Sequence, residues 1–512
     1  MLLGDVVAMG AHKYGDRAAL VFNDEQISFR ALHGRTKRLA NALLTLAAPG
    51  ERVAILSQNR PEFVDAYFGV PMAGMGLTFL NYRLNPRELS RIIADAQVSV
   101  LLVEDAYAVA IGQIRAELTM VRTIVAIGDG EVAGLADVRY EDLLAGAADT
   151  DPGVEVDEDD LAWLIYTSGT TGMPKGAMLS HDNLLTSITS WMIHSTNGVA
   201  SDVALMPFPL CHIAGVGVIS NVLMGVTLVL RRAYEPLDAM TMIDRYGVTA
   251  TAFAPTMLSM LLQHPQIEEF SLASLRTIAY GGSSMPVETL RRAMARFPDA
   301  DFVQGFGMTE LAGNVLYFDP SSHRLAATER PELLAAAGRT MALSRIRLVD
   351  EEMRDVPVGE VGEIVVRGDQ VMLGYWGRPD ANDEAFAGGW FHTGDMGRAD
   401  EQGYTAIVDR KKDMIVTGGE NVYSKEVEDV IYGVPGVAEA SVIGVPDPHW
   451  GENVIAVVVT AAGGTVTEDD VIATCRASLA GYKKPKRVVF VDELPRNASG
   501  KILKRELRER LT

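Results

Sequence analysis

Cysteine is nearly absent from this chain, because only Cys211 and Cys475 occur among 512 residues. Two cysteines do not make a disulfide framework, and their scarcity favours a reducing, cytoplasmic compartment. Positively charged residues are also scarce, since the chain has 46 lysines and arginines but 67 aspartates and glutamates, which gives a net charge of -21. Nucleic-acid ligands require a basic surface, so we expect no nucleic-acid partner.

Charge is missing altogether from residues 203–230, which contain no Asp, Glu, Lys or Arg. The stretch does contain two prolines, a histidine, an asparagine and several glycines, which disfavour a helix in a bilayer. We therefore expect buried core and no transmembrane segment, while peripheral membrane contact stays open. Residues 1–17 lack the basic start and cleavage site of a signal peptide. The oligomeric state is left open.

Short apolar runs alternate with amphipathic helical patterns, which is typical of an α/β protein. The second half changes to a smaller, glycine-punctuated β region, and a charge cluster at residues 409–413 then indicates a domain junction. The last hundred residues are predicted to form a small α+β domain, with Ser424 and Thr467 as helix N-caps. We predict one domain over residues 1–410 and a second over 411–512.

Five apolar runs are predicted to be buried strands that end in loops of glycine, proline and polar residues. They are residues 161–166, 203–206, 249–253, 275–280 and 301–304. Ligands of α/β sheets lie beyond the carboxyl ends of the strands, so five such loops from one sheet region suggest one shared site. After the first loop, Ser180 is a good helix N-cap, which predicts the order strand, loop, helix.

That first loop, residues 166–176, has the composition of a phosphate-binding loop. It reads Tyr-Thr-Ser-Gly-Thr-Thr-Gly-Met-Pro-Lys-Gly. Glycines let backbone N–H groups approach an anion, hydroxyls add donors and the lysine adds positive charge. The spacing is not that of a Walker A loop, because Gly169 and Gly172 are three apart and Gly176 follows Lys175.

Six motifs in order resemble the adenylate-forming superfamily of acyl-CoA synthetases, luciferases and peptide-synthetase adenylation domains. They are the phosphate loop and residues 305–310, 390–395, 409–410, 418–421 and 495–501. The resemblance covers nearly the whole chain. It implies a large N-terminal domain with stacked α/β sheets, followed by a mobile C-terminal domain that carries a catalytic lysine.

The resemblance also implies a reaction in two halves. A carboxylate attacks the α-phosphorus of ATP with Mg²⁺ present, which gives acyl-adenylate and pyrophosphate. A thiol then attacks the adenylate, and with coenzyme A as acceptor the products are a thioester and AMP. The leading hypothesis is an acyl-CoA ligase acting on a small-molecule carboxylic acid that is fatty or otherwise hydrophobic. A carrier-protein thiol as acceptor, an aryl acid as substrate, luciferase-type oxygenation and a non-catalytic nucleotide-binding regulator are the alternatives.

Site residues follow from the matched motifs. The residues implied for the β- and γ-phosphates are Thr167, Ser168, Gly169, Thr170, Thr171, Gly172 and Lys175. Glu310 is implied as the Mg²⁺ ligand, since magnesium prefers carboxylate and phosphate oxygens, and Thr309 is implied to touch the α-phosphate. Gly281, Gly282 and Ser283 are implied to meet the adenine edge and Phe306 to stack on adenine. Gly305 and Gly307 are implied to bind the cofactor. Asp395 is implied to bind the ribose hydroxyls, and Arg410 the ribose or phosphates.

The remaining assignments concern catalysis and domain movement. Lys501 is implied to offset charge on the carboxylate and α-phosphate during adenylation. His212 is implied to line the carboxylate end of the acyl pocket, with an ordinary core histidine as the alternative. Lys412 is implied to be the hinge about which the C-terminal domain turns. The loop brought in for the second half-reaction would be residues 418–421, of which Gly418, Gly419 and Glu420 are implied to bind the cofactor.

Overall fold

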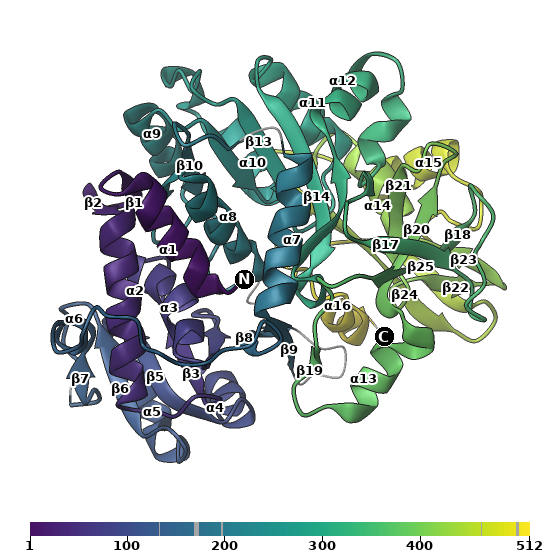
Figure 1. Cartoon of the computed structure of the whole chain (residues 1–512). Coiled ribbons are helices and arrows are strands. Elements are labelled where there is room, and N and C mark those ends of the chain that lie inside the picture. Colours follow the sequence, from purple (N-terminus) through teal and green to yellow (C-terminus); the bar gives the residue numbers. More distant parts are fainter. Residues whose placement is uncertain (133, 168–173, 196–197, 462, 498–500, 512) are drawn as a thin grey trace.

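A computed structural model describes residues 1–132, 134–167, 174–195, 198–461, 463–497 and 501–511 (Figure 1). The strands of these residues form four sheets, named A to D here. Sheet A runs in the order β16 (Arg339–Thr340), β15 (Gly313–Phe318), β14 (Asp301–Met308), β13 (Thr277–Gly281), β12 (Ala250–Phe253), β10 (Val203–Met206), β11 (Thr227–Leu230), β1 (Ala18–Phe22), β2 (Glu25–Ser28). Sheet B runs β19 (Gly374–Tyr375), β9 (Lys175–Ser180), β8 (Leu161–Thr167), β4 (Gly76–Leu80), β3 (Arg52–Leu56), β5 (Val98–Glu104), β6 (Thr123–Ile127), β7 (Val138–Arg139).

Two smaller sheets follow in the second half of the chain. Sheet C runs β17 (Arg345–Val349), β18 (Val361–Arg367), β20 (Phe391–Ala399), β21 (Thr405–Arg410). Sheet D runs β23 (Glu420–Val422), β22 (Ile415–Thr417), β25 (Gly451–Thr460), β24 (Val437–Asp447), and β26 (Arg487–Phe490) pairs with β25. Sheet C is the predicted glycine-punctuated β region.

Helices cover the sheets. Those of the first half are α1 (Leu3–Tyr14), α2 (Phe29–Leu44), α3 (Pro61–Met72), α4 (Pro86–Asp95), α5 (Ala108–Ile114), α6 (Tyr140–Ala145), α7 (His181–His194), α8 (Val216–Met224) and α9 (Pro236–Tyr246). Those of the second half are α10 (Pro255–Gln263), α11 (Val287–Arg296), α12 (Pro320–Thr328), α13 (Pro379–Ala385), α14 (Ser424–Tyr432), α15 (Glu468–Ser478) and α16 (Lys504–Leu511).

One buried cluster joins sheets A and B, so the two sheets are stacked as expected. It includes Leu228 of β11, Val53 of β3 and Trp163 of β8, together with Phe63 of α3. Burial of such side chains contributes about 1.5–3 kcal/mol each. The uncharged stretch 203–230 forms β10, α8 and β11 inside this domain. No helix within the described residues is long and apolar enough to cross a membrane.

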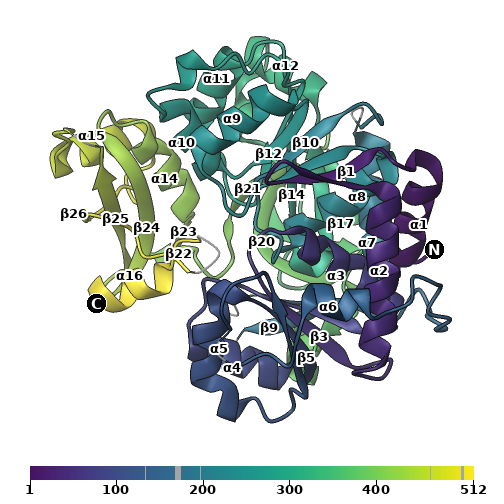
Figure 2. The ribbon, with the colours of Figure 1, turned by 90° about the vertical axis from the view of Figure 1, so that its left-hand side faces the viewer.

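Sheet D and its helices form the small C-terminal α+β domain, which lies at one side of the molecule (Figure 2). Its core includes the fully buried Val471 and Cys475 of α15. Burial raises the pKa of the Cys475 thiol to about 11. Thr467 caps α15 as predicted, with Asp470 completing a capping box. Ser424 is not a cap but the first residue of α14, which follows Tyr423.

Two expectations about the five predicted strands are wrong. Four of them, β10, β12, β13 and β14, are neighbours in sheet A, but β8 belongs to sheet B. An apolar run in the sequence predicts that a strand is buried, but it does not predict which sheet the strand joins. The loop after β8 also leads into β9, an antiparallel partner, before α7 begins. The Ser180 hydroxyl does cap α7 by accepting from the Asn183 N–H at 3.1 Å.

Candidate active site

Sheets A and B meet at Glu310, in the single 3-10 turn Thr309–Leu311 that follows β14. Its Oε1 accepts a hydrogen bond from the Thr167 hydroxyl at 3.2 Å, at the end of β8. The same oxygen accepts from the Tyr375 hydroxyl of β19 at 3.0 Å. Burial, reinforced by Glu310, raises the pKa of Tyr375 well above its usual range. The predicted metal ligand and the first predicted phosphate-loop residue are therefore in contact, although they come from different sheets.

Lys175 lies at the same place, because it pairs with Thr167 in the β8–β9 hairpin. Its ammonium is 4.9 Å from the centroid of the Tyr375 ring, a cation–π distance. The predicted phosphate ligands Ser168, Gly169, Thr170, Thr171 and Gly172 lie outside the described residues. Sequence reasoning did not single out Tyr375, since one tyrosine in a two-residue strand has no pattern that indicates a site.

Three of the predicted cofactor-binding glycines lie where the packing of sheet A leaves little room for a Cβ. A Cβ on Gly281 would lie 2.6 Å from the carbonyl oxygen of Gly305, its partner across β13 and β14. A Cβ on Gly307 would lie 1.8 Å from the carbonyl oxygen of Gly313 in β15. A Cβ on Gly305 would lie 2.5 Å from the side-chain amide nitrogen of Asn314, so the contact there is with a side chain and not with backbone. Because these residues are glycines, they place no side chains of their own over the backbone at the carboxyl ends of β13 and β14.

The other predicted adenine residues are more open. Gly282 has a φ of +80° and no neighbour that a Cβ would meet, so its glycine is needed for backbone conformation alone. Ser283 is exposed. Phe306 is half-buried and packs against the cluster shared by sheets A and B. An aromatic face at this edge fits the stacking of a planar base.

Asp395 is an almost fully buried carboxylate, with 2% of its surface exposed. It lies on β20 directly opposite Arg410 of β21, and the Arg410 Nε lies 2.5 Å from its Oδ1. Its Oδ2 is buried and has no hydrogen-bond partner among the described residues. Burial raises the pKa of Asp395, against the opposing effect of Arg410 and Lys501. A buried acceptor without a donor fits a ligand that supplies hydroxyl groups.

Lys501 is close enough to this carboxylate to interact with it electrostatically. Its pKa is lowered to about 8, first by desolvation and then by repulsion from Arg410, with Asp395 opposing the shift. The residue as a whole is exposed, yet protein surrounds the ammonium closely enough to remove part of its hydration. Asp395, Arg410 and Lys501, which the sequence analysis assigned to ribose and to catalysis, thus belong to one cluster formed across the two domains.

His212 follows β10 and immediately precedes a short 3-10 turn, Ile213–Gly215. Its Nε2 lies 3.5 Å from the Asn81 amide nitrogen, which follows β4 of sheet B. Burial, with a smaller contribution from Arg83, lowers the pKa of His212 to about 4, so the ring is neutral near pH 7. A neutral imidazole between the two sheets is compatible with the wall of an apolar pocket and with an ordinary core histidine alike.

The predicted hinge and second-step loop lie in the C-terminal domain. Lys412 is exposed and directly follows the pair Arg410 and Lys411. Gly418 and Gly419 form the turn between β22 and β23, with φ of +59° and +81°. The Gly418 N–H donates to the Trp450 carbonyl oxygen at 2.7 Å, and Glu420 is exposed.

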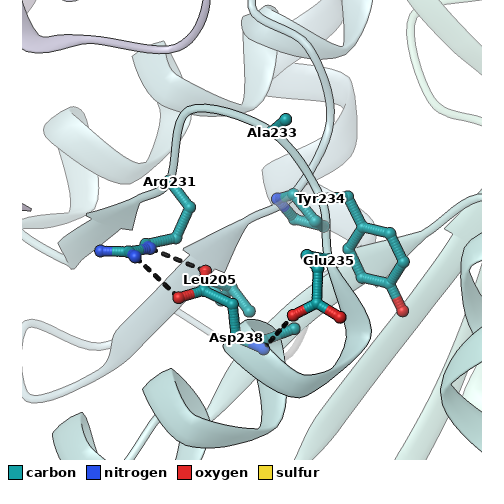
Figure 3. A pocket seen from close by; sticks show the side chains of 8 residues that line it. Leu205, Arg231, Ala233, Tyr234, Glu235 and Asp238 are labelled. Carbon is teal, nitrogen blue, oxygen red and sulfur yellow. Dashed lines mark hydrogen bonds and ion pairs between the residues drawn. The ribbon is translucent and has the colours of Figure 1, made fainter. Parts of the chain in front are cut away.

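A small cavity near the end of β10 is a separate feature (Figure 3). Its lining includes Tyr234 and Glu235, together with Arg231 and Asp238, which form an ion pair of 2.7 Å. Its volume of about 10 Å³ is sufficient for one water molecule and far too small for a nucleotide or an organic acid. None of the predicted site residues lines it.

Comparison with known proteins shows the family of this chain. The family model described as AMP-binding enzyme matches residues 7–376, and that of the AMP-binding enzyme C-terminal domain matches 426–501. A feruloyl-CoA synthase of an Amycolatopsis species is 40% identical over 487 residues, covering 94% of each chain. A long-chain-fatty-acid–CoA ligase of Mycobacterium tuberculosis is 36% identical, covering 95% of this chain and 93% of its own.

A solved structure is similar over the whole length. It is an anthranilate CoA ligase in complex with anthranoyl-AMP, with a TM-score of 0.92 and 27% identity, covering 100% of this chain and 97% of its own. The chain belongs to the AMP-binding enzyme family and, within it, to the AMP-forming acyl-CoA synthetases. Such an enzyme uses ATP, Mg²⁺ and coenzyme A together with a carboxylic acid.

Proposed function

We propose that this enzyme activates a hydrophobic carboxylic acid as its acyl-adenylate and then transfers the acyl group to coenzyme A. The observation that carries the proposal is the cluster of Asp395, Arg410 and Lys501. The buried Oδ2 of Asp395 lacks a donor among the described residues, and a ribose hydroxyl supplies one. Lys501 adds positive charge near Asp395. In this proposal it stabilises the negative charge that develops on the α-phosphate during attack by the carboxylate.

Other residues act on the triphosphate in this proposal. Thr167 and Lys175, at the paired ends of β8 and β9, bind the β- and γ-phosphates and keep them in place while attack occurs at the α-phosphorus. Glu310 would hold Mg²⁺ through its carboxylate, and the ion would supply positive charge to neutralise the phosphates, while Thr309 would contact the α-phosphate. Tyr375 holds the Glu310 carboxylate through its 3.0 Å hydrogen bond.

The adenylate is held without a covalent bond to the protein. Phe306 stacks on the adenine, while backbone groups of Gly281, Gly282 and Ser283 meet its edge. His212 lines the pocket near the carboxylate. Because its ring is neutral near pH 7, it excludes water without adding a competing charge.

The proposed division of the chain is residues 1–410 and 411–512. Sheet D has its own buried clusters, distinct from those of sheets A and B, which supports this division. Rotation about Lys412 would remove Lys501 from the site after adenylation and bring in the turn at Gly418, Gly419 and Glu420 for thioester formation. The acidic chain and its two free cysteines favour a cytoplasmic location.

An aryl acid is the second candidate substrate class. The feruloyl-CoA synthase similarity of 40% exceeds the 36% for the fatty-acid–CoA ligase, which favours testing aromatic acids alongside aliphatic ones. A carrier-protein thiol remains the alternative acceptor.

A pyrophosphate-release assay tests the proposal. Wild-type enzyme with ATP and Mg²⁺ would be given a panel of fatty acids, hydroxycinnamic acids and benzoic acids, each with and without coenzyme A. We expect acid-dependent pyrophosphate release, and thioester and AMP only when coenzyme A is present. Absence of acid-dependent release across the panel would refute ligase activity, and release without any thioester would favour a carrier-protein acceptor. The variant Lys501→Ala controls for contaminating ligases.

A further inference from the structure

A buried polar contact connects sheet C to the C-terminal domain beside the ribose carboxylate. Asp409 of β21 is 6% exposed, and Ser424, the first residue of α14, is fully buried. The Ser424 hydroxyl donates to Asp409 Oδ1 at 3.1 Å, and its backbone N–H donates to Asp409 Oδ2. A carboxylate at the first turn of a helix is also favoured by the helix dipole. The contact therefore joins the two domains through hydrogen bonds to a charged group.

Lys504 extends this contact toward the catalytic lysine. Its ammonium donates to the Ser424 hydroxyl and pairs with Glu428 of α14 at 2.7 Å. Lys504 begins α16 and lies only three residues after Lys501. The segment that carries Lys501 is thus tied, through Ser424, to Asp409.

Asp409 in turn is fixed relative to the ribose site. It immediately precedes Arg410, whose Nε lies 2.5 Å from Asp395 Oδ1. A second bond crosses the same boundary, because the Lys425 ammonium donates to the Ile407 carbonyl oxygen of β21 at 2.9 Å. Both crossing contacts join β21, on one side of residue 412, to α14 on the other.

The ion pair of Lys411 does not connect β21 to α14. Lys411 precedes residue 412, and its ammonium pairs with Glu363 of β18 at 3.0 Å. The proposed domain boundary falls after Arg410, but both residues precede Lys412, so a rotation about Lys412 would leave that ion pair intact. The same rotation would separate Ser424 from Asp409 and Lys425 from Ile407.

We propose that Asp409, Ser424 and Lys504 are positioning residues for adenylation. They hold Lys501 beside Asp395 in the arrangement of this structure. The contact has to break before the C-terminal domain can turn for thioester formation, so its strength sets the balance between the two half-reactions. This inference rests on the proposed two-step function and on rotation about Lys412.

The variant Ser424→Ala tests the proposal, since it removes the hydroxyl bonds to Asp409 and Lys504 and leaves the backbone bond. Acyl-adenylate formation in a single turnover should slow about 10-fold, as expected when a hydrogen bond to a charged group is lost. Thioester formation from supplied acyl-adenylate should be unchanged or faster. Ser441→Ala is the matched control, because that serine of β24 is fully buried and its hydroxyl has no partner among the described residues.

Equal slowing of both half-reactions in Ser424→Ala, or no slowing of either, would overturn the proposal. Ser441→Ala should change the rate of neither half-reaction. If Ser441→Ala also slowed adenylation more than thioester formation, that result would count against the inference. A purely structural role for Ser424 would lower Tm and both rates together.

A measurement without substrate separates this inference from the proposed function. Spin labels at Val358→Cys and Val416→Cys, which are 66% and 44% exposed, would report the distance between the two domains. The native Cys211 and Cys475 are buried and should not label. We expect one main distance in the wild-type background and a second population with Ser424→Ala. An unchanged distribution would refute the positioning role even if the enzyme proved to be a ligase.

Discussion

Replacing Asp395 by asparagine should weaken ATP binding without destabilising the protein. The amide is nearly isosteric with the carboxylate and keeps one oxygen to accept from Arg410, whose Nε is 2.5 Å from Oδ1. The NH₂ group would then occupy the position of the unpartnered Oδ2. That group donates and does not accept, so the ribose hydroxyl loses its acceptor.

The magnitude follows from the kind of bond that is lost. A hydrogen bond to a charged group contributes about 1.5–3 kcal/mol. At about 1.4 kcal/mol per tenfold change, Asp395→Asn should raise the Kd for ATP by about 10- to 150-fold.

Although Asp395→Asn should weaken ATP binding, it should not lower the free energy of unfolding of the protein. Burial raises the pKa of Asp395 above its value in the unfolded chain. An acid with a raised folded pKa favours the folded state below the unfolded pKa, and this contribution is lost as pH rises through the folded pKa. At neutral pH the buried carboxylate is therefore destabilising, and its neutral replacement should leave Tm unchanged or higher.

Isothermal titration with ATP and Mg²⁺, paired with thermal unfolding at pH 7, checks both parts. The matched control is Asp400→Asn, since Asp400 lies just beyond β20 and pairs with Arg330 at 3.0 Å, away from Asp395. The reasoning is refuted if Asp395→Asn binds ATP like wild type, or if its Tm falls by several degrees while ATP affinity is kept.

Three further predictions concern the same site. The Lys501 pKa of about 8 predicts that the rate of wild-type adenylation falls as pH rises through about 8, because the ammonium loses its proton. Lys501→Ala should adenylate far more slowly and should not show this fall with pH. A wild-type pH profile without the fall would contradict a charged role for Lys501. Lys412→Pro fixes φ at the hinge and should slow thioester formation more than adenylation in single-turnover assays, whereas equal slowing would argue against rotation there. Gly307→Ala places a Cβ 1.8 Å from the Gly313 carbonyl oxygen and should lower the free energy of unfolding by at least about 2 kcal/mol, measured by urea denaturation; wild-type stability would show that β14 and β15 can separate at little cost.

Local sequence patterns predicted local structure well. The cap at Thr467 is confirmed, and the helix that it begins buries Val471 and Cys475. Such features depend on residues within one or two helical turns of each other. The stacked α/β domain and the family assignment are confirmed as well, since they rest on motifs spread along the whole chain.

Features that depend on distant pairing were missed or wrong. The apolar run that became β8 gave no sign of belonging to sheet B, because a buried strand looks the same in either sheet. Ser424 was predicted to cap its own helix, yet Asp409, fifteen residues earlier, accepts its hydrogen bonds. The role of Tyr375 beside Glu310 has no local signature at all.

By itself, the amino-acid sequence determined which chemical groups this protein brings to adenylation, because glycines, hydroxyls, carboxylates and lysines at those spacings are properties of short segments. Only the tertiary structure decided where those groups meet. It placed Glu310 of one sheet against Thr167 of the other, and Lys501 of the C-terminal domain beside Asp395. It also left Asp395 Oδ2 buried without a partner among the described residues. Burial and charge proximity arise from the packing of segments far apart in the chain, so no local pattern encodes them.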